Sequence, residues 1–194
     1  MIGIVFSTKV LSDTIKGPVI PGGGPVMLNL MSSEKLENLK MTAFVRFYGI
    51  VLNPLVAIVS PTIIEMDDKR TVLKVPLNFV TRNHLKAMYF GALNIGAELS
   101  IAVLAFKKTR ESEKKIDFIF KDFKAQYLKR AQGDVHFICE DNETVLEQMN
   151  EAEISTERIN RTIKAYAVVP SQDPNERIAE FELTLSVRQR QAKA

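Results

Sequence analysis

Apolar and polar residues alternate most regularly near the C-terminal end of the chain. Between residues 178 and 187, every second position is apolar, at Ala179, Phe181, Leu183, Leu185 and Val187. A period of two predicts a strand with one buried face. The segment 159–169 repeats this pattern, and the turn-forming stretch 170–175 separates the two segments. We therefore expect two strands joined by a turn.

Two other segments show helical periodicity. The first follows the serine pair 32–33, which can cap a helix, and its apolar positions continue at helical spacing to Tyr48. It should end just before Pro54, because proline disfavours helix in the residue that precedes it. The second segment, from about Gly91 to Lys108, is apolar nearly all round. This is the pattern of a helix that is buried on all sides.

The remaining segments complete an order of two strands before the buried helix and four after it. The expected strands are 62–66, 71–77, 116–130, 135–140, 159–169 and 178–187. Between them we expect a loop at 78–88, a turn at 132–134, a short helix at 142–153, and either a short helix or an extended segment at 55–60. A helix that is apolar on all sides must be covered, and a curved antiparallel sheet of about six strands can cover it. The sequence therefore predicts an α+β fold in which such a sheet wraps one long helix, with an additional N-terminal helix.

The composition suits one ordinary globular domain. The chain has 194 residues, of which 46% are hydrophobic and 25% charged. Glycine and proline cluster before residue 26, so we interpret 1–31 as a Gly/Pro-rich N-terminal arm, 32–190 as a single domain and 191–194 as a basic tail. The net charge is +3, and basic residues are interleaved with acidic ones. This distribution disfavours a nucleic-acid partner.

The sequence suggests neither a targeting segment nor a metal centre. Its N-terminal apolar run is shorter than that of a signal peptide. The longest apolar stretch, 95–106, is about twelve residues, which is too short to span a bilayer. We therefore expect a cytoplasmic protein without membrane insertion. One cysteine, Cys139, and two histidines cannot build a familiar metal site, and no nucleotide-binding glycine motif is present. We expect no cofactor.

The most informative motif covers residues 83–98 and reads NHLKAMYFGALNIGAE. It places Gly91 at the start of the buried helix and Glu98 two turns further along the same face. Glu98 is the only charged residue between Gly91 and Phe106. A carboxylate in apolar surroundings is costly unless it is paired or protonated. Burial would raise its pKa, which suits general acid–base catalysis.

The start of the helix offers a second chemical group. The first N–H groups of a helix have no partner within it, and they attract negatively charged oxygens. A carbonyl directed at the Gly91 N–H would be stabilised as an oxyanion forms. Structural alternatives stay open for both residues: Gly91 could serve only helix packing, and Glu98 could be a structural carboxylate bonded to the backbone of a second subunit.

The order of elements and this motif resemble the hotdog superfamily, in which a long antiparallel sheet curls around a central helix. Its phenylacetate-type (PaaI-like) thioesterase branch has an Asn, a His-Gly-Gly that starts six positions later, and an acid nine positions after that His. Asn83, Gly91 and Glu98 fall on the Asn, the second Gly and the acid. Tyr89 and Phe90 stand in place of the His and the first Gly. The lead-in VPLNFVTRNH and the segment FGAL also look similar to a less characterised branch of the superfamily, many members of which are domains of unknown function. The resemblance covers roughly residues 36–190.

The resemblance implies hydrolysis of an acyl thioester, with coenzyme A or an acyl carrier protein as the leaving thiol. It also implies a homodimer or a larger oligomer such as a tetramer, with sites between subunits. Glu98 would be the general base or the nucleophile, Gly91 the oxyanion site, and Asn83 an orienting amide. The residues expected to bind substrate are Tyr89, Phe90, Asn94 and Lys86. Asn83 could instead be a turn residue, and Tyr89 could simply line the substrate tunnel.

The aromatic pair at 89–90 favours an alternative, a non-catalytic hotdog protein that binds acyl chains or fatty acids. A dehydratase-like enzyme is a further possibility, but such enzymes usually pair the acid with a histidine, and His84 is not at a matching position. The position of Glu98 discriminates between catalysis and binding. Catalysis requires Glu98 to face a tunnel mouth within reach of the Gly91 amide of its own or a second chain. A Glu98 sealed against bonded backbone favours binding.

Overall fold

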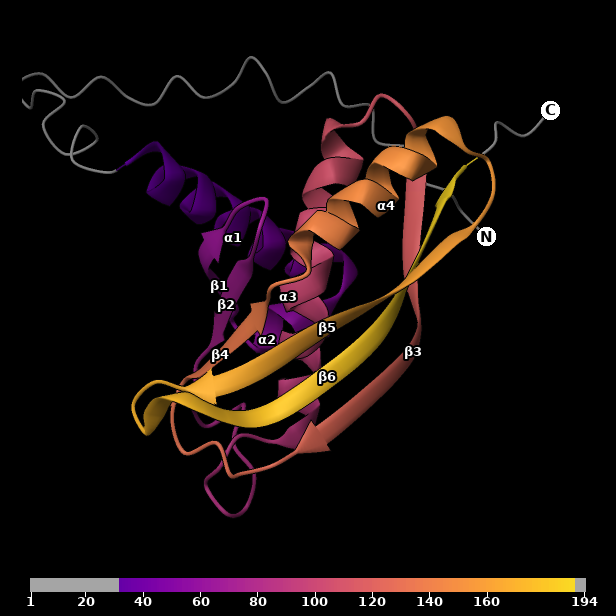
Figure 1. Ribbon diagram of the computed structural model, residues 1–194. Helices are drawn as coiled ribbons and strands as arrows, with labels where there is room; N and C mark the ends of the chain where they lie inside the picture. The colour runs from indigo at the N-terminus through magenta and orange to yellow at the C-terminus, as the bar shows by residue number, and fades with distance from the viewer. Residues whose placement is uncertain (1–31, 191–194) are drawn as a thin grey trace, which may run out of the picture.

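The computed structural model describes residues 32–190; the predicted N-terminal arm and the basic tail lie outside the described residues. Six strands form one antiparallel sheet that curls around a long central helix, which is the hotdog arrangement (Figure 1). The elements are, in chain order, α1 (Ser33–Leu52), α2 (Pro54–Ile58), β1 (Thr62–Met66), β2 (Thr71–Val75), α3 (Phe90–Glu111), β3 (Ile116–Tyr127), β4 (Val135–Cys139), α4 (Asn142–Ile154), β5 (Ile159–Val169) and β6 (Asp173–Gln189).

The N-terminal helices begin and end where the sequence predicts. The Ser32 side chain caps α1 by accepting a hydrogen bond from the backbone N–H of Lys35 at 3.4 Å. α1 ends at Leu52 and Asn53 caps it, because the next residue, Pro54, disfavours helix at the position before it. Pro54 is the first residue of α2. For the segment 55–60 the sequence allowed either a short helix or an extended segment. In the structure most of this segment is helical, because it belongs to α2.

The strand order in the sheet is β1-β2-β4-β5-β6-β3, so β1 and β3 form its two edges. β5 and β6 make the long hairpin that their alternating residues predict. One predicted connection is wrong: residues 132–134 do not close a hairpin, because β3 pairs with β6 while β4 pairs with β2 and β5. The chain instead crosses from the β3 edge to the middle of the sheet. Local turn composition cannot reveal this crossing, since the pairing of β3 depends on residues distant in sequence.

The core lies between the concave face of the sheet and α3. Phe137, Ile163 and Phe181, from β4, β5 and β6, are almost completely buried there. Gly96 lets α3 approach the sheet closely, since a Cβ atom at this position would lie only 2.3 Å from the Phe137 ring. By length and composition α3 could cross a membrane, but most of it is buried inside the fold, so it is the core helix that the sequence predicts.

The only cysteine of the sequence lies at the end of β4, inside this core. Cys139 is fully buried and is not part of a disulfide. Burial raises the pKa of its thiol to about 12. The thiol is therefore inert and structural, as its place in an alternating strand predicts.

Candidate functional site

One stripe along α3 is left uncovered by the sheet. The predicted all-round burial holds for most of the helix and fails along this stripe. Its members are half-buried or exposed and recur every three or four residues: Gly91, Asn94, Ile95, Glu98, Ala102, Phe106 and Thr109. This spacing places them on one face of the helix. The stripe is mostly apolar, so the fold leaves an apolar surface open at its centre.

Glu98 lies in the middle of this stripe. Its side chain makes no hydrogen bond or ion pair with any residue that the structure describes. More than a third of the residue remains exposed in the single chain. The surrounding protein atoms nevertheless desolvate the carboxyl, and this burial raises its pKa. Because no described donor or cation offsets the desolvation, Glu98 holds a proton more readily than an ordinary surface glutamate.

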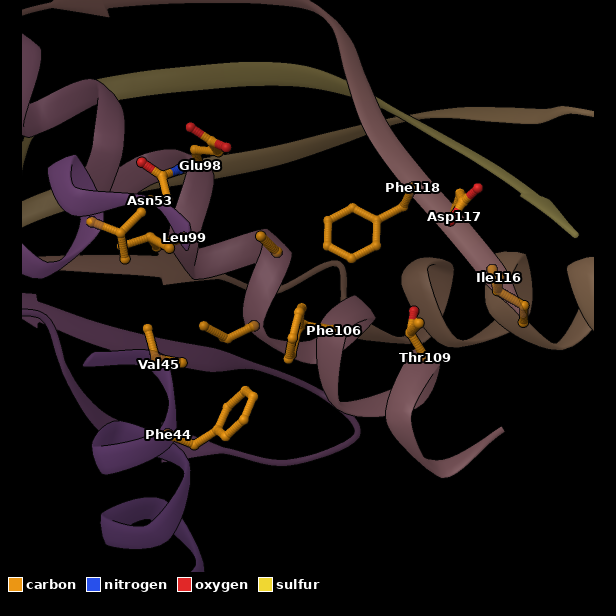
Figure 2. A pocket seen from close by; sticks show the side chains of 13 residues that line it. Phe44, Val45, Asn53, Glu98, Leu99, Phe106, Thr109, Ile116, Asp117 and Phe118 are labelled. Atoms are coloured by element: carbon orange, nitrogen blue, oxygen red, sulfur yellow. The ribbon is translucent and has the colours of Figure 1, made fainter. Parts of the chain in front are cut away.

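Glu98 borders two cavities, both of which lie beside β3. The first, of about 450 Å³, is bounded by α1, α2, α3 and the first residues of β3 (Figure 2). The second, of about 570 Å³, follows residues 118–123 of β3 and reaches Leu183 of β6. Glu98 therefore faces open space and is not sealed against bonded backbone, which meets the first of the two conditions for catalysis; the second, a Gly91 amide within reach, stays a prediction.

β3 has an irregularity beside Glu98. Its register to β6 shifts between Phe120 and Phe123, where β3 carries one extra residue and forms a β-bulge. The carboxylate of Asp122, in the bulge, accepts a hydrogen bond from the Thr184 backbone N–H at 3.1 Å. Asp122 is thus held by the sheet, whereas Glu98, across the second cavity, has no described partner. Sequence reasoning missed this bulge, because nothing in its composition marks it.

The N-terminal end of α3 places Gly91 beside an aromatic ring. Tyr89 is the N-cap residue, and its side chain makes no capping hydrogen bond. A Cβ atom on Gly91 would lie 2.5 Å from the Tyr89 ring, so a larger residue here would have to displace this exposed ring. The first N–H groups of α3 remain without helical partners, as at any helix start. Both interpretations of Gly91, packing and oxyanion binding, are compatible with this geometry.

Tyr127, which the sequence analysis did not identify, contacts two of the predicted substrate-binding residues, Phe90 and Asn94. The Tyr127 hydroxyl, at the end of β3, donates a hydrogen bond to the side-chain oxygen of Asn94. The ring of Phe90 meets the Tyr127 ring edge-on at 6.5 Å. Burial raises the pKa of Tyr127, and the hydrogen bond to Asn94 opposes this shift. Tyr127 lies 33 residues from Asn94 in sequence, so only the pairing of β3 could bring them together.

Asn83 and Lys86 lie in the loop before α3 and away from Glu98. The side-chain oxygen of Asn83 accepts hydrogen bonds from the backbone N–H groups of Leu85 at 2.9 Å and Ala87 at 3.2 Å. This is the turn chemistry that asparagine favours. Lys86 is exposed and has a positive φ of 60°. Neither residue lines either cavity beside Glu98.

Within one chain the two central groups of the motif are far apart. Gly91 and Glu98 are seven residues apart on a straight helix, which corresponds to about 10 Å along its axis. A general base and an oxyanion donor must both lie near the same carbonyl group, within about 3 Å of the atoms they serve. This separation is compatible with a site in which the base and the oxyanion donor come from two chains.

Sequence reasoning also missed Asn53. Figure 2 shows its side-chain amide on the same side of the first cavity as the Glu98 carboxyl. Asn53 ends α1, and its side chain makes no capping hydrogen bond for α2. The sequence marks it only as the residue before Pro54, where the helix must stop. Its amide is available to orient a water molecule or a carbonyl near Glu98.

These features define a class. A curved antiparallel sheet of six strands around a central helix is the hotdog fold. The chain belongs to the family described as domain of unknown function DUF4442, which matches residues 42–187. Among curated proteins, no sequence matches this chain.

Solved structures with this fold include several thioesterases. A candidate thioesterase from Shewanella oneidensis is 12% identical, with a TM-score of 0.62, covering 76% of this chain and 96% of its own. A Pseudomonas aeruginosa protein of unknown function, considered a candidate thioesterase, is 20% identical, with a TM-score of 0.60 and coverages of 77% and 96%. A thioesterase from Haemophilus influenzae is 14% identical, with a TM-score of 0.52 and coverages of 74% and 88%. At these identities the likeness establishes the fold.

Proposed function

We propose that the protein hydrolyses acyl thioesters, with Glu98 as the general base or as the nucleophile itself. The main support is an unpaired carboxylate on the open face of the core helix, bordered by two cavities. As general base, Glu98 takes a proton from water while the water oxygen bonds to the carbonyl carbon. The carbon–sulfur bond then breaks, and the thiol leaves with that proton. The raised pKa of Glu98 makes its carboxylate a stronger base than a surface glutamate.

A second copy of the chain would complete the site. Gly91 lies about 10 Å along α3 from Glu98, and in this proposal the oxyanion donor that serves one Glu98 comes from another molecule. We propose a homodimer in which the Gly91 N–H of the second copy, or a water held by Asn53, stabilises the oxyanion. The exposed aromatic pair Tyr89–Phe90 would then lie at the subunit interface.

The β3 edge is the surface that suits this second copy. β3 pairs with β6 on one side only, and its outer edge is free within the described residues. Ile119, Phe123 and Tyr127 are exposed along it. A long unpaired edge is a template for pairing with another strand. Two β3 strands related by a two-fold axis would extend the sheet and bring both Glu98 regions to the interface.

The thiol carrier would meet basic residues near the start of α3. Arg82 and Lys86 are exposed on the preceding loop, and the phosphates of coenzyme A or of a carrier prosthetic group suit such cations. Lys107 and Lys108, further along α3, are less available. Lys107 pairs with Glu37, and Lys108 pairs with Glu111 at 3.2 Å.

A specific observation favours a second function, non-catalytic binding of acyl chains. The Tyr89 ring covers the side of Gly91, where the related thioesterases have a His-Gly entry. Phe90 adds further bulk beside it, with its ring 4.8 Å from that of Tyr89. If this aromatic pair keeps the carbonyl from the helix start, the cavities would bind the acyl chain without hydrolysing its ester.

The deciding experiment measures thiol release from short, medium, long and aromatic acyl-CoAs, with the wild type beside Glu98→Gln. We expect turnover by the wild type and a loss of at least about 100-fold in Glu98→Gln, because removal of one catalytic proton-transfer group typically costs this much. A matched control is Glu153→Gln, which changes an exposed glutamate on α4 far from both cavities. It should retain wild-type turnover.

The outcomes separate the two functions. Turnover that survives in Glu98→Gln would exclude Glu98 as the base or nucleophile. No turnover on any acyl-CoA, together with tight binding of acyl-CoA or fatty acid, would establish the binding protein instead.

A further inference from the structure

We infer that the first cavity binds an unbranched acyl chain of medium length, and that an aromatic cluster from α1, α3 and β3 limits this length. The inference rests on the proposed function, since it takes Glu98 as the position of the thioester. The cavity lies on the side of α3 that faces the N-terminal helices, and the rest of the sheet core is closed behind it.

The wall of the cavity has a polar end and an apolar body. Glu98 and Asn53 lie together at one side, and Thr109 and Ile116 lie at the other (Figure 2). Between them the lining is apolar and comes from three sources: Val45 and Val56 of the N-terminal helices, Leu99 and Ala102 of α3, and Phe118 of β3. A ligand in this space meets a reactive group at one end and only apolar surface along its length.

The polar groups at the far end are already satisfied. The Thr109 hydroxyl donates a hydrogen bond to the Ala105 carbonyl at 2.9 Å. The Asp117 carboxylate accepts two hydrogen bonds from Arg190, at 2.8 Å and 2.6 Å. Neither group calls for a polar ligand. Burying a polar chain here without new partners would be unfavourable, so the cavity selects for a hydrocarbon.

The dimensions of the cavity set the length of this hydrocarbon. From Glu98 to Thr109 the helix advances eleven residues, or about 16 Å. A linear acyl chain of medium length therefore suits the space between Glu98 and the far end of the cavity. The volume of about 450 Å³ lies in the usual range of pockets for small organic ligands.

An aromatic cluster closes the far part of the cavity. The rings of Phe44 and Phe106 lie 5.3 Å apart, and the Phe118 ring meets Phe106 edge-on at 6.5 Å. The Arg110 guanidinium covers the Phe44 ring at 4.0 Å. The three rings come from α1, α3 and β3, so the position of α1 helps to determine where the acyl chain must end.

The test narrows the cavity at Ala102, one turn beyond Glu98 on the same face of α3. Ala102→Phe would place a ring in the path of the chain while leaving room for a short acyl group. We expect the ratio of kcat/KM for dodecanoyl-CoA to that for acetyl-CoA to fall by about 30-fold or more, because a pocket that loses several methylene contacts discriminates at this level. The matched control, Ala43→Phe, adds the same ring on the exposed side of α1 and should leave the ratio unchanged.

Binding provides a readout that does not require hydrolysis. Dodecanoate should displace a fluorescent fatty acid from the wild type and from Ala43→Phe, but not from Ala102→Phe. Should Ala102→Phe fail to fold, Ala102→Leu provides a milder version, and Phe106→Leu should shift the preference toward longer chains by widening the closed end.

The outcomes distinguish this inference from the proposed function. Hydrolysis by the wild type with an unchanged chain-length ratio in the folded Ala102 variants would overturn the acyl cavity and leave the thioesterase intact. Absence of hydrolysis, with dodecanoate binding lost only in the Ala102 variants, would support the cavity and overturn the thioesterase. A wild type that neither hydrolyses nor binds would overturn both.

Discussion

The two edges of the sheet are treated differently by the fold. The β1 edge is covered by α1, whose polar side chains reach the outer backbone groups. The Thr42 hydroxyl accepts a hydrogen bond from the Ile63 N–H at 2.9 Å, and Asn38 donates one to the Ile64 carbonyl at 3.3 Å. The β3 edge, more than twice as long as β1, has no such cover within the described residues (Figure 1).

This difference in cover between the two edges indicates which edge could pair with another molecule. An uncovered edge strand is an aggregation hazard that proteins normally block. Here the side chains of α1 cover the β1 edge, and within the described residues no helix covers the edge that borders Glu98 and both cavities. The edge left open is thus the one beside the candidate site, which fits a site completed by a second copy.

The largest expected effect comes from placing a charge on the open edge. Ile119→Lys changes an apolar residue of β3 that is 54% exposed, and a lysine on each copy would oppose pairing. We expect a dimer in the wild type and a monomer in the variant, with thioester turnover reduced about 100-fold because the oxyanion donor is lost. Size-exclusion chromatography with light scattering and a thiol-release assay measure the two effects.

The opposite edge provides the matched control. Ile64→Lys changes an isoleucine of β1 that is 46% exposed and should leave both the dimer and turnover intact. Dissociation by Ile64→Lys, or a fully active Ile119→Lys monomer, would contradict the assignment of the interface to β3.

A smaller effect should follow from uncovering the protected edge. Thr42→Val keeps the shape of a buried side chain but removes the acceptor for the Ile63 N–H. An unsatisfied buried N–H costs about 1–3 kcal/mol. We expect the free energy of unfolding, measured with urea, to fall by about that amount. Thr156→Val, at an exposed position before β5, is the control and should change it little. Equal stabilities of the two variants would show that the α1 contacts do not protect this edge.

The smallest expected effect concerns the pH dependence of stability at Glu98. Its pKa is raised in the folded chain, so the ionised carboxylate is less favourable there than in the unfolded chain. This penalty is absent below the ordinary glutamate pKa, grows as pH rises toward the raised folded pKa, and is constant above it. Glu98→Gln removes the ionisable group. We expect its melting temperature to exceed that of the wild type by about 1–3 °C at pH 8 and to match it near pH 4.

Thermal melting across this pH range checks the sign. A Glu98→Gln variant that is less stable than the wild type at pH 8 would mean that Glu98 has a stabilising partner, for example in the second subunit.

Much of the fold could be predicted because it follows from local patterns. The period of two in β5 and β6 and the apolar length of α3 predict the sheet and its helix, and Ser32 and Pro54 mark the limits of α1. The crossing from β3 to β4 could not be predicted, since strand pairing depends on residues far apart in sequence. The open stripe on α3 was also missed. An apolar face on a helix looks the same whether the sheet, a ligand or a second subunit covers it.

The candidate site was predictable only in part, for the same reason. Spacing from the helix start identifies Glu98, which the structure leaves unpaired beside two cavities. Asn53 and Tyr127 reach the site region through the α1–α2 junction and the pairing of β3, and neither signal is local. Asn83 matches the motif, but its side-chain oxygen is used by its own loop.

The burial of Cys139 has a practical consequence for all the turnover measurements. Product thiols are usually detected with reagents that react with thiolates, and a reactive protein cysteine would add background. Cys139 is the only cysteine of the chain, it is fully buried, and its pKa is raised to about 12. The folded protein should therefore not react with these reagents, and any signal above the blank measures the released thiol. Because Cys139 is unreactive, a single cysteine introduced on β3 can carry a spectroscopic label without removal of the native cysteine.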